Sequence, residues 1–207
     1  MSKRTRAKSF SRRKPSRKPY DKILVVCEGQ QTEPNYFNGL KNYLRLNGAN
    51  VAIVGEGAAP TTIVERAKAL DKWWKGMGDP FDKIFCVFDK DTHADYQTAI
   101  DQCAQKNYVA VTSVPAFEYW LLLHFRYTTK PYDDVSGVLH ALKEWMPNYH
   151  KSYAGIFAEL RDKLETAKKN AARSLEDRTQ ARTDNPSTKV HILVQSQRWL
   201  GKFEQGG

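Results

Sequence analysis

Acidic residues stand directly after two apolar segments of the chain. Glu28 follows the run Ile-Leu-Val-Val-Cys at residues 23–27, and Asp89-Lys90-Asp91 follows the run Ile-Phe-Cys-Val-Phe at residues 84–88. Unbroken apolar, β-branched runs of this length are typical of buried strands in parallel sheets. In open α/β sheets, the chemistry lies just beyond the carboxyl ends of the strands. We therefore expect Glu28, Asp89 and Asp91 to form one acidic site at a single rim of the sheet.

Carboxylates that lie close together at one rim of a sheet repel one another unless they bind a cation or keep a proton. Hard oxygen ligands favour Mg²⁺ or Mn²⁺, and such an ion can orient a phosphodiester, stabilise its developing charge and activate a water. Glu28, Asp89 and Asp91 are therefore candidates both for metal binding and for catalysis. The alternative is that the aspartates are ordinary residues at strand-to-loop junctions and helix caps.

Three further residues could extend this site. Glu118 interrupts a row of apolar side chains, so it either pairs with Arg126 or another base, or it adds a carboxylate. Lys90 could contact a phosphate or point into solvent. His93 could transfer a proton, although histidines are common in loops.

Two residues in the later part of the chain could also have a functional or a structural part. Lys189 lies at the start of the last expected helix, where free N–H groups attract anions, so that segment either contacts a phosphate or simply caps the helix. His124 is expected to be a hydrogen-bonded core histidine.

Most of the positive charge lies in the first residues. Residues 1–22 hold ten of the 33 Lys and Arg and one of the 23 Asp and Glu, so they carry +9 of the net charge of +10. Residues 1–20 are too polar to fold alone, and we expect a disordered basic arm ahead of one domain at 21–207. The arm either keeps the protein in solution or binds the phosphates of RNA or DNA. Its candidate nucleic-acid-binding residues are Arg4, Arg6, Arg12, Arg13, Lys14, Arg17 and Lys18.

Strand and helix patterns alternate between residues 22 and 112. This alternation predicts an α/β fold with a parallel sheet and right-handed crossovers. Thr32 or Glu33 is expected to cap a first helix that has Pro34 in its first turn and ends at Asn47-Gly48. Thr62 and Glu65 have the spacing of a capping box.

The remainder of the chain is expected to be helical and to pack on the sheet. The expected helices lie at 116–125, at 134–146, at 152–176 as one long exposed helix, and after the cap residues 185–188.

Cysteine usage and hydropathy bear on the compartment. Cys27, Cys86 and Cys103 have no metal-like spacing, and two of them lie in expected strands, so we expect reduced core thiols in a cytoplasmic protein. No apolar run is long enough to span a membrane, and the N-terminus lacks the apolar segment of a signal peptide. A homo-oligomer remains compatible with the sequence.

Four segments together resemble the RloB-like proteins. They are 26–33 (Val-Cys-Glu-Gly-x-x-Thr-Glu), 88–91 (Phe-Asp-Lys-Asp), 113–125 (Ser-x-Pro-x-Phe-Glu-x-Trp-Leu-Leu-Leu-His-Phe) and 185–190 (Asn-Pro-Ser-Thr-Lys-Val). The third segment is the most specific. RloB-like proteins are in turn similar to the Toprim nucleases of the OLD and AbiL type, which occur in defence loci beside an ATPase gene.

This resemblance implies a Toprim-like parallel sheet and a nuclease acting on DNA or RNA in antiviral defence. It implies that Glu28 is a general acid/base or metal ligand, that Asp89 and Asp91 hold the ion, and that a partner ATPase controls the enzyme. Whether one or two ions bind stays open. The sequence has no Walker motif, so ATP-driven control would require another chain.

Two other functions compete with a nuclease. Asp89-Lys90-Asp91-Thr92 loosely resembles the motif of haloacid dehalogenase phosphatases, but the threonine comes one residue early and that motif normally opens the fold. The stronger alternative is a non-catalytic module that binds nucleic acid or a protein complex through the basic arm.

Overall fold

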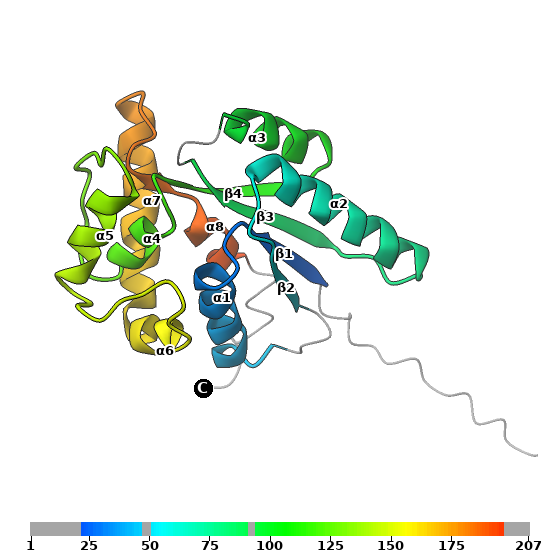
Figure 1. Cartoon of the computed structure of the whole chain (residues 1–207), viewed down its shortest axis with the longest axis horizontal. Helices are drawn as coiled ribbons and strands as arrows, with labels where there is room; N and C mark the ends of the chain where they lie inside the picture. Colours follow the sequence, from blue (N-terminus) through cyan, green and yellow to red (C-terminus); the bar gives the residue numbers. More distant parts are fainter. Residues whose placement is uncertain (1–21, 47–50, 91–93, 197–207) are drawn as a thin grey trace, which may run out of the picture.

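A five-stranded sheet forms the centre of the protein (Figure 1). The computed structural model describes residues 22–46, 51–90 and 94–196. The strand order is β2-β1-β3-β4-β5. The strands are β1 (Ile23–Cys27), β2 (Val51–Gly55), β3 (Lys83–Asp89), β4 (Val109–Val114) and β5 (Ser187–Thr188). The first four strands pair in parallel, so the expected parallel α/β sheet is confirmed, and β5 adds an antiparallel strand beside β4.

The register brings the carboxyl ends of β1 and β3 to the same edge. Cys27, the last residue of β1, is paired with Val87 of β3, and Asp89 at the end of β3 is paired with Ser113 of β4. Glu28 therefore leaves the sheet beside the last residues of β3. Neighbouring strands lie about 4.8 Å apart, so this register places Glu28 and Asp89 next to each other.

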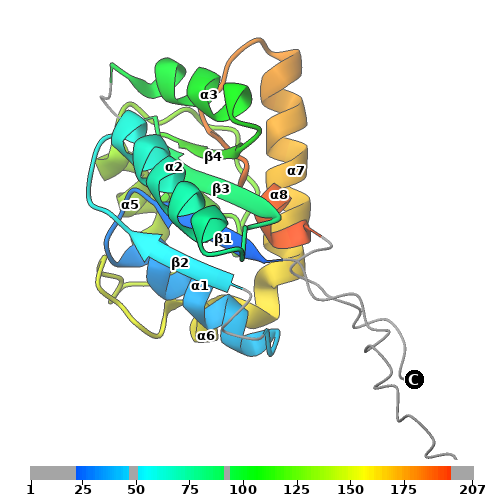
Figure 2. The same ribbon diagram turned by 90° about the vertical axis from the view of Figure 1, so that its right-hand side faces the viewer.

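Alternate side chains of the central strands enter two different cores, as the two-residue period of a strand requires. Ile23, Val25 and Cys27 face the core that contains α1 (Thr32–Tyr43) and the C-terminal helices. Leu24 and Val26 face the smaller core under α2 (Pro60–Gly76) and α3 (Tyr96–Gln105). Figures 1 and 2 show α2 and α3 together on one face of the sheet.

The C-terminal third packs on the sheet, as expected, but its helices are shorter and more numerous. They are α4 (Glu118–Leu122), α5 (Val135–Lys143), α6 (Ile156–Leu160), a 3₁₀ turn at Arg161–Lys163, α7 (Leu164–Gln180) and α8 (Val190–Gln195). The expected single helix at 152–176 is wrong, because the 3₁₀ turn interrupts it. Nor is α7 simply an exposed helix, since the small side chains of Ala167 and Ala171 are fully buried against the core.

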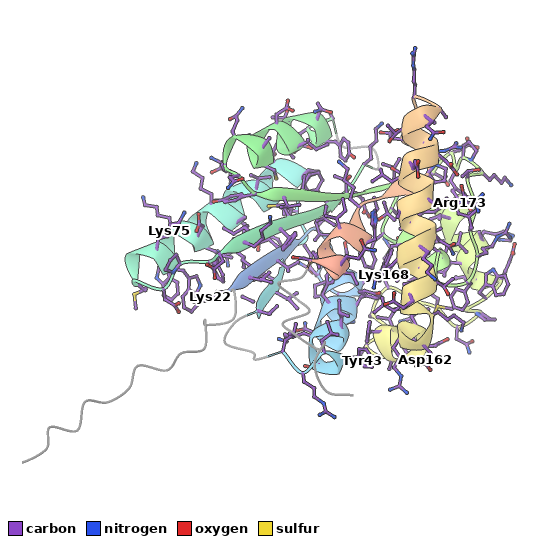
Figure 3. All side chains as sticks on the ribbon, turned by 180° about the vertical axis from the view of Figure 1, so that it is seen from behind. Lys22, Tyr43, Lys75, Asp162, Lys168 and Arg173 are labelled. Atoms are coloured by element: carbon purple, nitrogen blue, oxygen red, sulfur yellow. The ribbon has the colours of Figure 1, made fainter. Side chains whose placement is uncertain are left out.

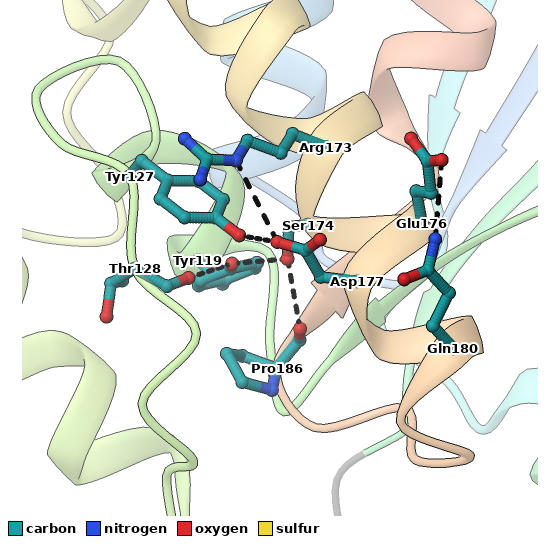
Figure 4. A network of polar contacts seen from close by, with 9 residues as sticks. All are labelled: Tyr119, Tyr127, Thr128, Arg173, Ser174, Glu176, Asp177, Gln180 and Pro186. Atoms are coloured by element: carbon teal, nitrogen blue, oxygen red, sulfur yellow. Dashed lines mark hydrogen bonds and ion pairs between the residues drawn. The ribbon is translucent and has the colours of Figure 1, made fainter.

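Buried hydrogen bonds hold α7 against the rest of the C-terminal region (Figure 4). The Tyr119 hydroxyl of α4 donates to the carbonyl of Thr128 at 2.7 Å and lies 2.7 Å from the Ser174 hydroxyl of α7. Ser174 in turn donates to the carbonyl of Pro186, just before β5, at 3.2 Å. Figure 3 shows α7 from behind, with Lys168 and Arg173 along it.

Several expected helix ends are wrong. α1 begins at Thr32 itself, after Gln31, so neither Thr32 nor Glu33 caps it through a side chain. α1 ends at Tyr43, and Asn47-Gly48 lie outside the described residues. The Thr62–Glu65 capping box does not form, because α2 begins two residues earlier at Pro60.

Two further comparisons concern the last strand and the cysteines. Residues 187–188, expected to be cap residues, form β5 because Ser187 and Thr188 pair with the end of β4. The three cysteines are free and buried, as expected. None of the helices in the described part of the chain has the length and apolar character needed to cross a bilayer.

Candidate active site

Glu28 and Asp89 meet at the carboxyl edge of the sheet. The Glu28 N–H donates to the carbonyl of Val87 at 2.9 Å, which continues the pairing of β1 with β3 by one residue. The Asp89 N–H then donates to Glu28 Oε2 at 2.9 Å. Both residues line a cavity of about 680 Å³. The expected convergence of these two acidic residues is confirmed.

Asp89 has one carboxylate oxygen that is satisfied and one that is not. Oδ2 accepts a hydrogen bond of 3.0 Å from the Phe117 N–H, whereas Oδ1 is buried without a hydrogen-bond partner in the described part of the chain. Burial raises the pKa of Asp89 well above its usual value, and the nearby charges of Glu33 and Glu118 raise it further. The site therefore holds a buried acceptor oxygen that receives no hydrogen bond from the residues that the structure describes.

Glu33 is a member of the site that we did not expect from the sequence. Its side chain turns back so that Oε1 accepts from the Gly29 N–H at 3.1 Å. A Cβ on Gly29 would lie 2.0 Å from Glu33 Oε2, so the glycine leaves the room that this carboxylate occupies. Burial raises the pKa of Glu33 to about 7, and the charges of Glu118 and Glu28 add to that increase. The signal available in the sequence was the Glu-Gly-x-x-Thr-Glu spacing, in which Glu33 lies one turn after Gly29.

Glu118 contributes a fourth carboxylate to the cavity. It is buried at the start of α4, and the Tyr149 hydroxyl donates to its Oε1 at 3.0 Å. Arg126 lies instead 3.9 Å from Glu144, in an exposed ion pair. Of the two expectations for Glu118, the structure therefore supports its membership of the acidic cluster.

Loops from both halves of the chain complete the cavity wall. Gly57, Ala58 and Ala59, between β2 and α2, line the cavity, as do Lys151 and Ser152 before α6. The Thr32 hydroxyl donates to the carbonyl of Lys151 at 2.7 Å, which fixes this second loop to the start of α1. The helical C-terminal region thus contributes directly to the cavity at the sheet edge.

The donor atoms suit a divalent cation that prefers oxygen. Four carboxylates line the cavity, and one buried oxygen of Asp89 has no donor among the residues at 22–46, 51–90 and 94–196. Mg²⁺ and Mn²⁺ take such ligands and complete their coordination with water or phosphate. Within the described residues, no three His, Cys, Asp or Glu side chains already stand together as a set of metal ligands. Asp91, the third expected ligand, lies outside the described residues.

Comparison with known proteins identifies the family. Residues 23–196 match the family of RloB-like proteins. The chain belongs to the RloB-like family. The match covers every strand and helix described above, including all four carboxylates of the cavity. No curated protein matches the RloB-like chain.

The remaining candidates of the RloB-like chain lie away from the cavity or outside the described residues. Lys90 forms an ion pair with Asp184 at 2.5 Å and is not among the residues that line the cavity. Lys189 is half-buried and also does not line it. The following candidates lie outside the described residues: Asp91, His93, Arg4, Arg6, Arg12, Arg13, Lys14, Arg17 and Lys18.

His124 is a core residue, as expected. It is fully buried, its Nε2 lies 3.1 Å from the Tyr36 hydroxyl, and its Nδ1 lies 3.0 Å from the carbonyl of Trp120. Burial lowers the pKa of His124 to about 4, so it is neutral at physiological pH.

Proposed function

We propose that this RloB-like protein is a metal-dependent nuclease of Toprim type that cleaves phosphodiester bonds in RNA or DNA. The observation that carries the proposal is the meeting of Glu28 and Asp89, from neighbouring strands, in one cavity with Glu33 and Glu118. Four carboxylates gather in one cavity, and two of them belong to the buried residues Glu33 and Glu118. This arrangement is typical of a functional site rather than of a structural one.

The four carboxylates have different parts in this proposal. Glu28, Asp89 and Glu118, together with Asp91, would hold Mg²⁺ or Mn²⁺, and the ion would supply charge neutralisation at the phosphodiester and a more acidic bound water. Glu33 has a pKa of about 7, so it exchanges a proton readily near neutral pH and is suited to act as the general base. Tyr149 and Gly29 orient Glu118 and Glu33 through the hydrogen bonds described above.

A cleavage panel tests this function. The full chain is incubated with Mg²⁺ or Mn²⁺ and with plasmid, single-stranded DNA or total tRNA, beside the variants Glu28→Gln, Asp89→Asn and Glu144→Gln. Glu28→Gln and Asp89→Asn should reduce cleavage by at least about a hundredfold, because each removes a charge from the cluster. Glu144→Gln is the matched control, since Glu144 is exposed and lies outside the cavity.

The same panel separates the nuclease from a binding module. Nucleic-acid binding without turnover in either metal, in wild type and variants alike, would contradict the nuclease and favour a non-catalytic module. In that case the concentration of charge in residues 1–22, which carry +9, would be the main functional feature.

We further propose that the nuclease is a cytoplasmic antiviral effector controlled by a partner ATPase. This proposal follows the resemblance of RloB-like proteins to defence nucleases. The sequence has no Walker motif, so ATP-driven control would come from another chain. Cleavage by the chain mixed with a candidate partner ATPase should depend on ATP, and it should be unchanged by ATP when the chain is alone.

A further inference from the structure

Lys151 is the one cationic residue among the described residues that line the acidic cavity. The ionisable residues around it are Glu28, Glu33, Asp89 and Glu118, all acidic. A nucleic acid that approaches this cavity brings further negative charge and would be repelled by the carboxylates. A lysine in the cavity lining can therefore offset this repulsion and attract a phosphate.

The loop that carries Lys151 is held beside the acidic cluster by two hydrogen bonds, one of them to the Lys151 carbonyl. The Lys151 carbonyl accepts from the hydroxyl of the buried Thr32, the residue next to Glu33. Two residues earlier, the Tyr149 hydroxyl donates to Glu118. The loop that carries Lys151 is thus tied at two points to residues of the cluster, although it lies far from them in sequence.

The Lys151 side chain has no partner in the described part of the chain. Lys22, Lys75 and Lys90 each form an ion pair with an aspartate. Lys151 is exposed and forms no such pair with any residue that the structure describes, in spite of the four carboxylates in the same cavity. Its ammonium is a compact charge with three donors on a flexible stem, so it remains available to an incoming anion.

We propose that Lys151 binds a phosphate of the nucleic-acid backbone beside the carboxylate cluster. This inference rests on the proposed function and adds to it a substrate-binding residue contributed by the C-terminal region rather than by the sheet. The cluster, with its cation, would hold the phosphate that reacts, and Lys151 would hold a neighbouring one. Lys151 thereby sets the position of the strand in the cavity and takes no part in bond cleavage.

The test measures nucleic-acid binding separately from cleavage. The full-length wild type is compared with the variants Lys151→Gln, Lys151→Arg and Lys72→Gln. Binding is followed by the anisotropy of a labelled single-stranded DNA and of an RNA of the same sequence, in EDTA and over a range of NaCl concentrations. Lys151→Gln should weaken binding about three- to tenfold. The slope of log K against log salt should become shallower by about 0.7, the value for one lost phosphate contact on a single strand.

The other variants distinguish a phosphate contact from a structural effect. Lys151→Arg should retain wild-type binding because it keeps the charge, and Lys72→Gln removes an exposed lysine that does not line the cavity, so it should bind as wild type. In Mn²⁺, Lys151→Gln should raise KM for the nucleic acid more than it lowers kcat. Thermal unfolding followed by circular dichroism should be the same for all four proteins.

The inference and the proposed function can fail independently. Equal affinity and equal salt slope for Lys151→Gln and wild type would overturn the inference and leave the Glu28→Gln cleavage result standing. Loss of binding in Lys151→Arg as well as in Lys151→Gln, with a lowered unfolding temperature, would also overturn it, since the loop would then act only through its fold. Binding that depends on Lys151, in a protein that cleaves nothing, would uphold the phosphate contact and contradict the nuclease.

Discussion

The Glu33 side chain carries a carboxylate into a nearly closed position, with only 5 % of the residue exposed. Because its pKa is raised from 4.5 to about 7, the folded protein keeps a proton there that the unfolded chain loses. Between these two pH values the folded state binds more protons than the unfolded state, so this group makes stability fall as pH rises. Above the folded pKa the cost of the buried charge is fully present.

Replacing Glu33 with glutamine should therefore stabilise the protein at high pH. In EDTA, Glu33→Gln should raise the free energy of unfolding by roughly 1–3 kcal/mol at about pH 8, and the gain should vanish toward about pH 4.5. Glutamine keeps an oxygen to accept from the Gly29 N–H, so little packing changes. Urea unfolding at a series of pH values measures this difference.

The exposed Glu144→Gln is the control, and its stability should follow wild type at every pH. A Glu33→Gln variant that is less stable than wild type at about pH 8 would show that the Glu33 carboxylate stabilises the fold and is not a strained part of the site.

The site residues that lie at the ends of strands could be predicted from the sequence. Glu28 and Asp89 could be placed because parallel strands bring their carboxyl ends to one edge. Glu33 could not, because its inward position depends on the absence of a side chain at Gly29 and on a hydrogen bond to that residue. Lys151 could not either, since its loop is held at the cavity by hydrogen bonds between residues far apart in sequence, from Thr32 to Lys151 and from Tyr149 to Glu118.

Helices α1 and α6 pack so closely that a glycine is required between them. A Cβ on Gly39 of α1 would lie 2.5 Å from Cβ of Phe157 in α6. That atom is next to the backbone and cannot swing away. Gly76, the last residue of α2, has no atom of its surroundings within 4 Å of such a Cβ.

The two glycines should respond in opposite ways to the same substitution. Gly39→Ala should lower the free energy of unfolding by about 1–3 kcal/mol, because overpacking outweighs the better helix propensity of alanine. Gly76→Ala should be neutral or raise it by up to about 1 kcal/mol. Urea unfolding of both variants measures the contrast, and equal gains in both would mean that α6 moves away from α1 without cost.

The elements themselves were predictable to different degrees. The strands Ile23–Cys27 and Lys83–Asp89 followed from apolar runs that stop at acidic residues. The two-residue strand Ser187–Thr188 could not be predicted, because it forms only by pairing with the end of β4. The break at Arg161–Lys163 was hidden, since its residues are compatible with a helix and long-range packing decides the turn.

On the scale of the whole molecule, charge is distributed very unevenly along the chain. Residues 1–22 carry +9 of the net charge of +10, so the rest of the protein is nearly neutral. Non-specific affinity for nucleic acid depends on the phosphates neutralised by Lys and Arg. The protein should therefore owe most of its salt-sensitive affinity to this segment.

Deleting residues 1–20 tests that expectation. The shortened chain should bind single-stranded DNA and RNA at least about tenfold more weakly at low salt, with a shallower salt dependence. Its unfolding midpoint should be unchanged, because the described core begins at Lys22. Anisotropy titrations measure the binding, and an unchanged affinity would reduce the segment to a solubilising tail.

The two hydrogen bonds that join Thr32 to Lys151 and Glu118 to Tyr149 also bear on how the protein is made. During synthesis, the strands next to Glu28 and Asp89 leave the ribosome long before the loop that carries Lys151 and Ser152. A nascent chain that stops short of residue 152 has the acidic edge but lacks one wall of its cavity. Under the proposed nuclease function, the active site would thus be incomplete until the loop at residues 151–152 had been synthesised.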